Sequence, residues 1–154
     1  MKVIFKIISI FILVLFMKNS NAIAQQKISP VLNHIAISVY DLNESTKFYK
    51  EIIGLEIIPE PFKDGKHTWF SLGNLGQFHV ISGAEKEVKH LRSSHICFSV
   101  ISMEDYIKNL EHNKIEYSNW AGERNAVTLR PDGIKQIYFQ DPDGYWIEVN
   151  NDHK

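Results

Sequence analysis

The chain has 154 residues, a formal net charge of −1 and 44% apolar side chains. A charge so close to zero provides no long-range attraction to nucleic acid or to an anionic membrane surface, so neither is predicted as a partner. The single cysteine, Cys97, excludes an intrachain disulfide and a zinc site built from several cysteines. Because Cys97 stands within an apolar segment, we predict that it is a small buried residue.

Residues 1–24 are predicted to be a secretory signal peptide. Lys2 and Lys6 precede an apolar run over 7–17, which is shorter than the roughly 20 residues that a bilayer span requires. Ala-Ile-Ala at 22–24 matches the A-x-A pattern of a cleavage site. We therefore predict cleavage after Ala24, a periplasmic or extracellular location, and no stable membrane association of the mature chain. An uncleaved N-terminal anchor is the alternative.

The mature chain is predicted to begin with a flexible lead, 25–30, followed by one domain over 31–151. Its first module, 31–83, shows the order β-α-β-β-β. The predicted elements are a strand over 32–39, a helix capped by Asp41 or Asn43 that ends near Ile53 before Gly54, a short strand at 57–58, and strands over 67–72 and 77–82.

A charged linker over 84–94 separates this module from a second one, 95–151, with the same order. Its predicted elements are a strand over 95–100, a helix that begins after Ser102 and ends near Asn113 or Lys114, a strand over 115–117, and a hairpin over 136–150 that turns at Asp141-Pro-Asp-Gly144. Residues 127–130 are a candidate for an additional short strand. We predict an α+β protein made of two tandem βαβββ modules.

The two modules repeat each other at polar positions. His34-Ile-Ala-Ile-Ser-Val39 corresponds to His95-Ile-Cys-Phe-Ser-Val100. One phenylalanine stands nine residues before His79 and another nine residues before Glu148. His79 and Glu148 therefore occupy equivalent positions, as do His34 and His95, and a pseudo-twofold axis could bring all four side chains to one point.

These four side chains are suitable ligands for a first-row divalent metal, which favours imidazole and carboxylate groups. A carboxylate in an apolar strand is costly unless it is paired or bound to a metal, and Glu148 lies in such a strand. We predict a metal or acid–base site at His34, His79, His95 and Glu148, with Zn, Ni, Co, Mn or Fe as the candidate ion. The alternative is four unrelated polar residues on solvent-facing strands.

The chain resembles the vicinal oxygen chelate superfamily, which includes glyoxalase I, methylmalonyl-CoA epimerase, fosfomycin resistance enzymes, extradiol dioxygenases and bleomycin resistance proteins. The residues that carry the resemblance are Asn33–Val39, Phe48-Tyr-Lys50 with Gly54-Leu55, His95-Ile96 and Asp141–Glu148. The resemblance implies that the two modules form an open, U-shaped β-barrel around one divalent metal ion, held by the four side chains. A homodimer is also implied, because in several members two chains share each site.

The reaction implied by the resemblance is Lewis-acid catalysis, in which the metal stabilises an enolate or oxyanion of a small oxygenated substrate. Glu148 is the candidate base and His79 an alternate proton shuttle. Candidate substrate contacts are Trp69, Trp120, Arg124, Arg130, Lys135 and Tyr138.

Glyoxalase I, or lactoylglutathione lyase, is the most similar subfamily, and it predicts a metal-dependent lyase or isomerase. It differs from this chain by a Glu at the place of His79, an Arg at Ser38 and an Asn at Gly83, so the metal ligands are retained while groups that bind glutathione are not. An extradiol-type dioxygenase that uses His34, His95 and Glu148 is one alternative, and a metal-free drug-binding protein is another.

Overall fold

The computed structural model describes residues 29–152, and from Leu32 onward the described chain forms one compact unit. The predicted signal peptide and its cleavage point lie outside the described residues, as does most of the predicted lead. Between residues 29 and 152 no helix has the length and apolar character needed to cross a membrane. The α+β class and the two-module order are confirmed.

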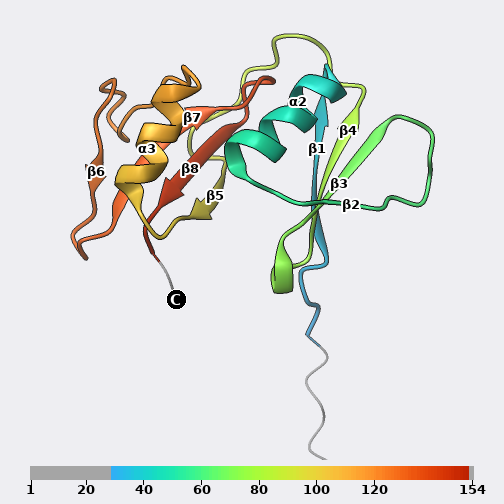
Figure 1. Ribbon diagram of the computed structural model, residues 1–154, viewed down its shortest axis with the longest axis horizontal. Helices are drawn as coiled ribbons and strands as arrows, with labels where there is room; N and C mark the ends of the chain where they lie inside the picture. The colour runs from blue at the N-terminus through green and yellow to red at the C-terminus, as the bar shows by residue number, and fades with distance from the viewer. Residues whose placement is uncertain (1–28, 153–154) are drawn as a thin grey trace, which may run out of the picture. The chain divides into compact units, whose positions relative to one another are not determined.

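The first module forms a four-stranded sheet of order β1-β4-β3-β2, in which β1 runs parallel to β4 and the other neighbours are antiparallel. Helix α2 lies beside this sheet (Figure 1) and contacts β3 and β4. The elements are β1 (His34–Val39), α2 (Leu42–Phe48), a π-helical turn (Tyr49–Ile53), β2 (Ile57–Ile58), β3 (His67–Ser71), a 3-10 turn (Gly73–Leu75) and β4 (Gln77–Ser82).

The predicted helix of this module begins and ends where the sequence indicates, but it is not uniform. Asp41 caps it by accepting the backbone N–H groups of Asn43 and Glu44 at 2.9 and 3.0 Å, and Gly54 ends it with a φ of 86°. Phe48 and Tyr49 are consecutive and both buried. Consecutive residues of a straight α-helix point about 100° apart, so they cannot both point to the centre of one buried face. From Tyr49 onward the helix is π-helical.

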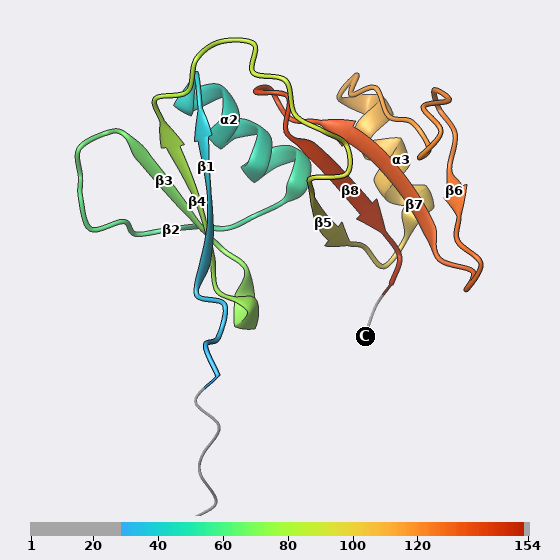
Figure 2. The same cartoon turned by 180° about the vertical axis from the view of Figure 1, so that it is seen from behind.

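The second module forms a separate sheet of order β5-β8-β7-β6 (Figure 2). Its elements are β5 (His95–Ser99), α3 (Met103–His112), β6 (Thr128–Leu129), β7 (Lys135–Gln140) and β8 (Trp146–Asn150). The predicted strand over 115–117 does not form. Only Ser118 makes isolated bridges, to Arg124 and Tyr138, because the apolar residues of this segment are buried by packing rather than by a strand ladder.

Strand register confirms the internal duplication. His79 on β4 lies opposite Trp69 on β3, and Glu148 on β8 lies opposite Tyr138 on β7. The parallel pair β1–β4 also has the same register as β5–β8. The repeated sequence pattern therefore becomes a repeated placement of ligand-type side chains.

The core consists of the apolar sheet faces together with the inner faces of the helices, and it includes residues of both modules. Its largest fully buried side chains are Tyr49, Phe70, Phe78, Phe139, Met103, Leu110, Ile137 and Ile147. The two sheets are not closed into a barrel, because β1 and β5 each pair with one neighbour only within the described residues.

Candidate metal and substrate site

The first module brings His34 and His79 into direct contact. Their rings stack with centroids 4.4 Å apart and an interplanar angle of 13°. Trp69 stacks on His79 at 3.9 Å and 5°, so the His79 imidazole lies between two rings. His79 is buried whereas His34 is exposed. Within the described chain the indole N–H of Trp69 is buried without a hydrogen-bond partner.

Both imidazoles of this pair have a nitrogen lone pair available. His34 Nδ1 donates to Asn33 Oδ1 at 2.8 Å, and His79 Nε2 donates to Gln77 Oε1 at 2.9 Å. Burial lowers the pKa of His79, and the charges of His34 and His67 lower it further. A neutral imidazole is the form that binds a metal, so the lowered pKa of His79 suits it to that role near neutral pH.

The second module places His95 Nε2 only 3.1 Å from Glu148 Oε2. His95 Nδ1 lies 2.8 Å from the carbonyl oxygen of Arg92. A carbonyl oxygen can only accept, so Nδ1 carries the proton and orients the ring. Nε2 then faces the carboxylate, and an imidazole nitrogen beside a carboxylate oxygen is a pair of donor atoms that a divalent metal ion can bind.

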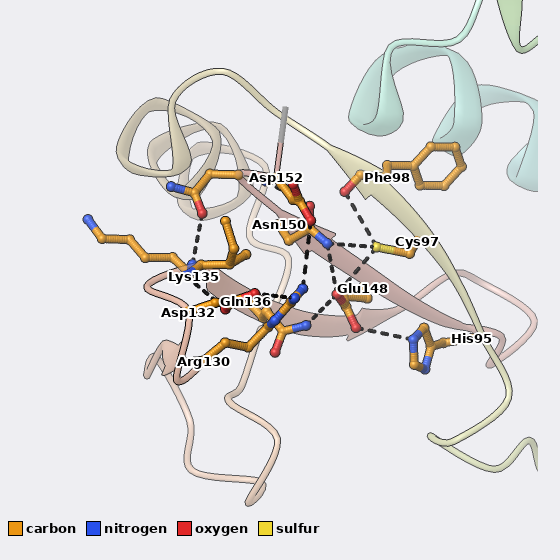
Figure 3. A network of polar contacts seen from close by, with 12 residues as sticks. His95, Cys97, Phe98, Arg130, Asp132, Lys135, Gln136, Glu148, Asn150 and Asp152 are labelled. Atoms are coloured by element: carbon orange, nitrogen blue, oxygen red, sulfur yellow. Dashed lines mark hydrogen bonds and ion pairs between the residues drawn. The ribbon is translucent and has the colours of Figure 1, made fainter. Parts of the chain in front are cut away.

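Glu148 is the centre of the hydrogen-bond network shown in Figure 3. Its Oε1 accepts from Gln136 Nε2 at 2.6 Å and from Asn150 Nδ2 at 3.0 Å, and its Oε2 accepts from the Tyr138 hydroxyl at 2.8 Å. Burial by itself raises the pKa of Glu148, but these hydrogen bonds, with one from Cys97, outweigh it and hold the pKa below its usual range. Glu148 is therefore an anionic carboxylate at neutral pH.

Cys97 is not the buried apolar residue that its sequence context predicts. It is exposed, and its Sγ lies 3.3 Å from Glu148 Oε1 and 3.1 Å from Asn150 Nδ2. Partial burial of the thiol, followed by the charge of Glu148, raises the pKa of Cys97 to about 12. A thiol with such a pKa stays protonated at neutral pH, so Cys97 acts as a hydrogen-bond donor rather than as a nucleophile.

The two pairs do not merge within one chain. Among residues 29–152, no three His, Cys, Asp or Glu side chains gather in a way that could hold a metal ion. The structure therefore brings His34 to His79 and His95 to Glu148 but does not unite the pairs.

Three predicted substrate residues lie next to these pairs. Trp69 covers His79, and Tyr138 contacts Glu148. Trp120 is 51% exposed and lies edge-on to Tyr138, with ring centroids 5.4 Å apart.

The three predicted basic substrate residues are engaged in ion pairs. Arg124 pairs with Glu116 at 3.1 Å, Arg130 with Asp132 at 2.5 Å, and Lys135 with Glu104. Lys135 shares a face of β7 with the core residue Ile137, away from Tyr138 and Glu148. Arg130 lies close enough to Cys97 and Tyr138 for its positive charge to lower the pKa values of their side chains. This effect is smaller than that of burial, which raises both pKa values.

Two residues of the second module and one of the linker contribute to the site without having been identified from the sequence. Gln136 and Asn150 bind Glu148, and the Arg92 carbonyl orients His95. The two-residue period of a strand places Gln136 and Asn150 on the required faces. The role of Arg92 depends on how the linker folds, for which the sequence contains no comparable signal.

The family is shown by comparison with known proteins. Residues 31–149 match the family model described as the Glyoxalase/Bleomycin resistance protein/Dioxygenase superfamily. The chain belongs to this superfamily, which confirms the resemblance read from its motifs. Most characterised members are enzymes, and several use divalent metals and small-molecule substrates.

The relatives carry names of different reactions. Metallothiol transferase FosB from Staphylococcus epidermidis is 31% identical over 128 residues, covering 77% of this chain and 80% of FosB. Glyoxylase I 4 from Arabidopsis thaliana is 28% identical over 127 residues, covering 78% and 70% respectively. The crystal structure of the fosfomycin resistance protein FosX from Listeria monocytogenes has a TM-score of 0.64 at 23% identity, covering 82% of this chain and 96% of FosX, and shows the shared fold.

Proposed function

We propose that this protein is a divalent-metal-dependent lyase or isomerase of the glyoxalase type that acts on a small oxygenated compound. The observation that carries the proposal is the pairing of His34 with His79 and of His95 with Glu148 at equivalent strand positions. Two imidazoles with available lone pairs in one module, and an imidazole beside an anionic carboxylate in the other, form a ligand set for a first-row metal.

A bound divalent ion would stabilise negative charge that develops on a substrate oxygen. The protein's own residues have separate tasks. Glu148 Oε2 is the proton acceptor, and the Tyr138 hydroxyl, which donates to this oxygen at 2.8 Å, keeps it anionic and oriented. His79, neutral because burial lowers its pKa, is the alternate proton shuttle at Nδ1.

We infer that the working form is a homodimer in which each site combines the first module of one chain with the second module of its partner. Two features support this arrangement. The pairs lie on separate sheets within 29–152 and no three ligands meet there. Strands β1 and β5, which carry His34 and His95, each have a free edge among the described strands, and a free edge can pair with another chain.

Mixing two inactive variants tests the shared site. In a twofold dimer of this kind, a heterodimer of His34→Ala and Glu148→Ala has one intact site and one doubly substituted site. Equal mixing after joint refolding should therefore restore about a quarter of the metal sites and of the activity. If each chain completes its own site, the mixture stays as inactive as either variant.

The metal and the reaction are tested together by elemental analysis and a screen of substrate classes with and without chelator. We expect about one divalent ion per chain, lost in His34→Ala, and chelator-sensitive conversion of a compound with two neighbouring oxygens. Absence of tight metal binding after incubation with Ni, Co, Zn, Mn and Fe would refute the proposal. Iron-dependent oxygen uptake with a catechol would indicate a dioxygenase instead, and ligand binding insensitive to chelator would indicate a drug-binding protein.

A second candidate, metal-dependent thiol transfer, is favoured by the 31% identity with metallothiol transferase FosB. The two reactions differ in how much free thiol is used for each molecule of product. A lyase or isomerase converts one bound compound, whereas a thiol transferase consumes one free thiol for each product formed. 2-Oxoaldehydes consume thiol without an enzyme by forming hemithioacetals. Free thiol is therefore followed alongside product with substrates that have no aldehyde group, with glutathione as one of the thiols, and thiol loss that matches product identifies the transferase.

We also propose that the protein is exported and that cleavage follows Ala24, on the sequence pattern of residues 1–24. N-terminal sequencing of the protein from its native cell should begin at Gln25. A chain that retains Met1 would contradict this proposal.

A further inference from the structure

We propose that a cavity beside Tyr138 binds the negatively charged part of the substrate, which makes the substrate class a small oxygenated compound bearing a carboxylate, phosphate or phosphonate group. The inference rests on the proposed function, because it treats this cavity as the outer part of the same substrate site. The residues that carry it are Arg92, Lys114 and Arg124, with Trp146 and Tyr138.

The cavity has a volume of about 400 Å³, which is within the range of small-molecule sites. Tyr138 on β7 and Trp146 on β8 line it. The Tyr138 hydroxyl donates to Glu148, so a ligand that lies against Tyr138 is separated from the second metal-ligand pair by one side chain. Another cavity, of about 500 Å³ and lined by Tyr40, Lys86 and Asp143 among others, includes no hydrogen-bond partner of Glu148, whereas the 400 Å³ cavity includes Tyr138.

The lining of the 400 Å³ cavity carries more positive than negative charge. Its lining contains the cationic residues Arg92, Lys114 and Arg124 but a single carboxylate, Glu116. The whole chain, by contrast, has a formal charge of −1. A concave surface lined by one sign of charge concentrates the electrostatic potential and raises the local concentration of counter-ions. The cavity is therefore selective for anions.

Arg92 is held in place with part of its guanidinium group still available. Its Cζ lies 4.1 Å from the centre of the Trp146 ring. Its NH1 atom donates to the carbonyl oxygens of Asn119 and Trp120 at 3.2 and 2.9 Å. Among the described residues these are its side-chain hydrogen bonds, and they leave NH2 and Nε to donate to an oxyanion. A preoriented guanidinium binds carboxylate or phosphate groups in a two-point geometry.

The other two cations can be recruited at little cost. Arg124 and Glu116 pair at 3.1 Å with side chains 76% and 73% exposed. An ion pair so exposed contributes little to stability, so a ligand anion can replace Glu116. Lys114 is exposed and has no ion-pair partner within residues 29–152. Two mobile cations therefore face one oriented guanidinium around the cavity.

The test is a titration of the ¹⁵N-labelled mature chain with lactate, methylphosphonate and neutral 1,2-propanediol, followed by NMR. The neutral chelator 1,10-phenanthroline is present, so that neither a metal ion nor an anionic chelator contributes. We expect at least one of the two anions to shift the amide resonances of Ser118, Gly122 and Gln140 at millimolar concentration, while the diol does not. The tighter of the two anions identifies carboxylate or phosphonate as the preferred group.

A double variant, Lys114→Gln with Arg124→Gln, should weaken anion binding by roughly tenfold, which is about 1.4 kcal/mol for the two exposed charged contacts together. The matched control, Lys50→Gln with Lys108→Gln, removes the same charge from exposed positions outside the cavity, and Lys108 is ion-paired as Arg124 is. We expect it to bind the anions as the native chain does.

Equal binding by the double variant, or equal shifts with the diol, would overturn the anion site. The outcome is separable from that of the proposed function. Anion binding without any metal affinity refutes the metal-dependent enzyme alone. Metal binding without an anion effect refutes only the assignment of the cavity.

Discussion

The turn between β7 and β8 contains a buried acid whose ionisation makes stability depend on pH. Asp141 is 5% exposed, and it accepts hydrogen bonds from the Tyr49 hydroxyl at 2.7 Å and from the backbone N–H groups of Asp143 and Tyr145 at 3.0 and 2.8 Å. Burial nevertheless dominates and raises the pKa of Asp141 from 3.8 to about 6. The native state therefore binds this proton more tightly than the unfolded chain does.

A folded pKa above the unfolded value stabilises the protein fully below about pH 4, and this stabilisation is lost as the pH rises through about 6. A shift of about two pH units corresponds to about 3 kcal/mol of unfolding free energy. The direction is opposite to that of a carboxylate in a salt bridge, whose contribution increases with pH. Asp141 should thus make the fold less stable at neutral pH than at mildly acidic pH.

The assay is urea denaturation between pH 4 and pH 8 of the native chain and of Asp141→Asn. The amide oxygen of Asn can still accept the two backbone N–H groups, so the turn is kept while the titration is removed. We expect the native-minus-variant difference in unfolding free energy to fall by about 3 kcal/mol across this range. The control is Glu85→Gln, at an exposed carboxyl that forms no ion pair within residues 29–152, and the fall should be specific to Asp141→Asn. A difference for Asp141→Asn that stays constant or grows with pH would refute the reasoning.

Tyr138→Phe removes a hydrogen-bond donor to Glu148, and such a donor helps to orient a metal-binding carboxylate. We expect metal binding, measured by calorimetry, to weaken by about tenfold. Unchanged affinity would show that this hydrogen bond does not position the carboxylate. Gly76→Ala should lower the unfolding free energy by about 3 kcal/mol or more. The residue has a φ of 112°, which strains a side-chain-bearing residue, and the added Cβ would lie 2.2 Å from the Asn33 carbonyl oxygen. Gly65→Ala, at a φ of 68° with open space around it, isolates the backbone contribution, and an equal loss in both variants would contradict the predicted clash.

Much of the fold could be predicted because it depends on local patterns. Caps such as Asp41 and Ser102, and turn residues such as Gly54 and Gly144, act within a few positions of themselves, and their roles agree with the structure. The equivalence of His79 with Glu148 was also predictable, because the same nine-residue spacing in the two modules places equivalent residues in the same register. The absence of a strand over 115–117 could not be predicted, because apolar residues in a short segment indicate burial but do not indicate whether the segment pairs with another strand.

The amino-acid sequence by itself determined the modules, their order and the four ligand-type side chains, because alternation along a strand decides which residues share a face. Only the tertiary structure decided what surrounds those side chains. Gln136 and Tyr138 reach Glu148 across the β7–β8 pairing, and Asn150 reaches it along β8. The linker carbonyl of Arg92 reaches His95 because of the way the chain turns just before β5. Tertiary packing also decided that the four side chains form two pairs on two sheets, because β1 pairs with β4 and β5 pairs with β8, whereas β1 and β5 do not pair in the described chain.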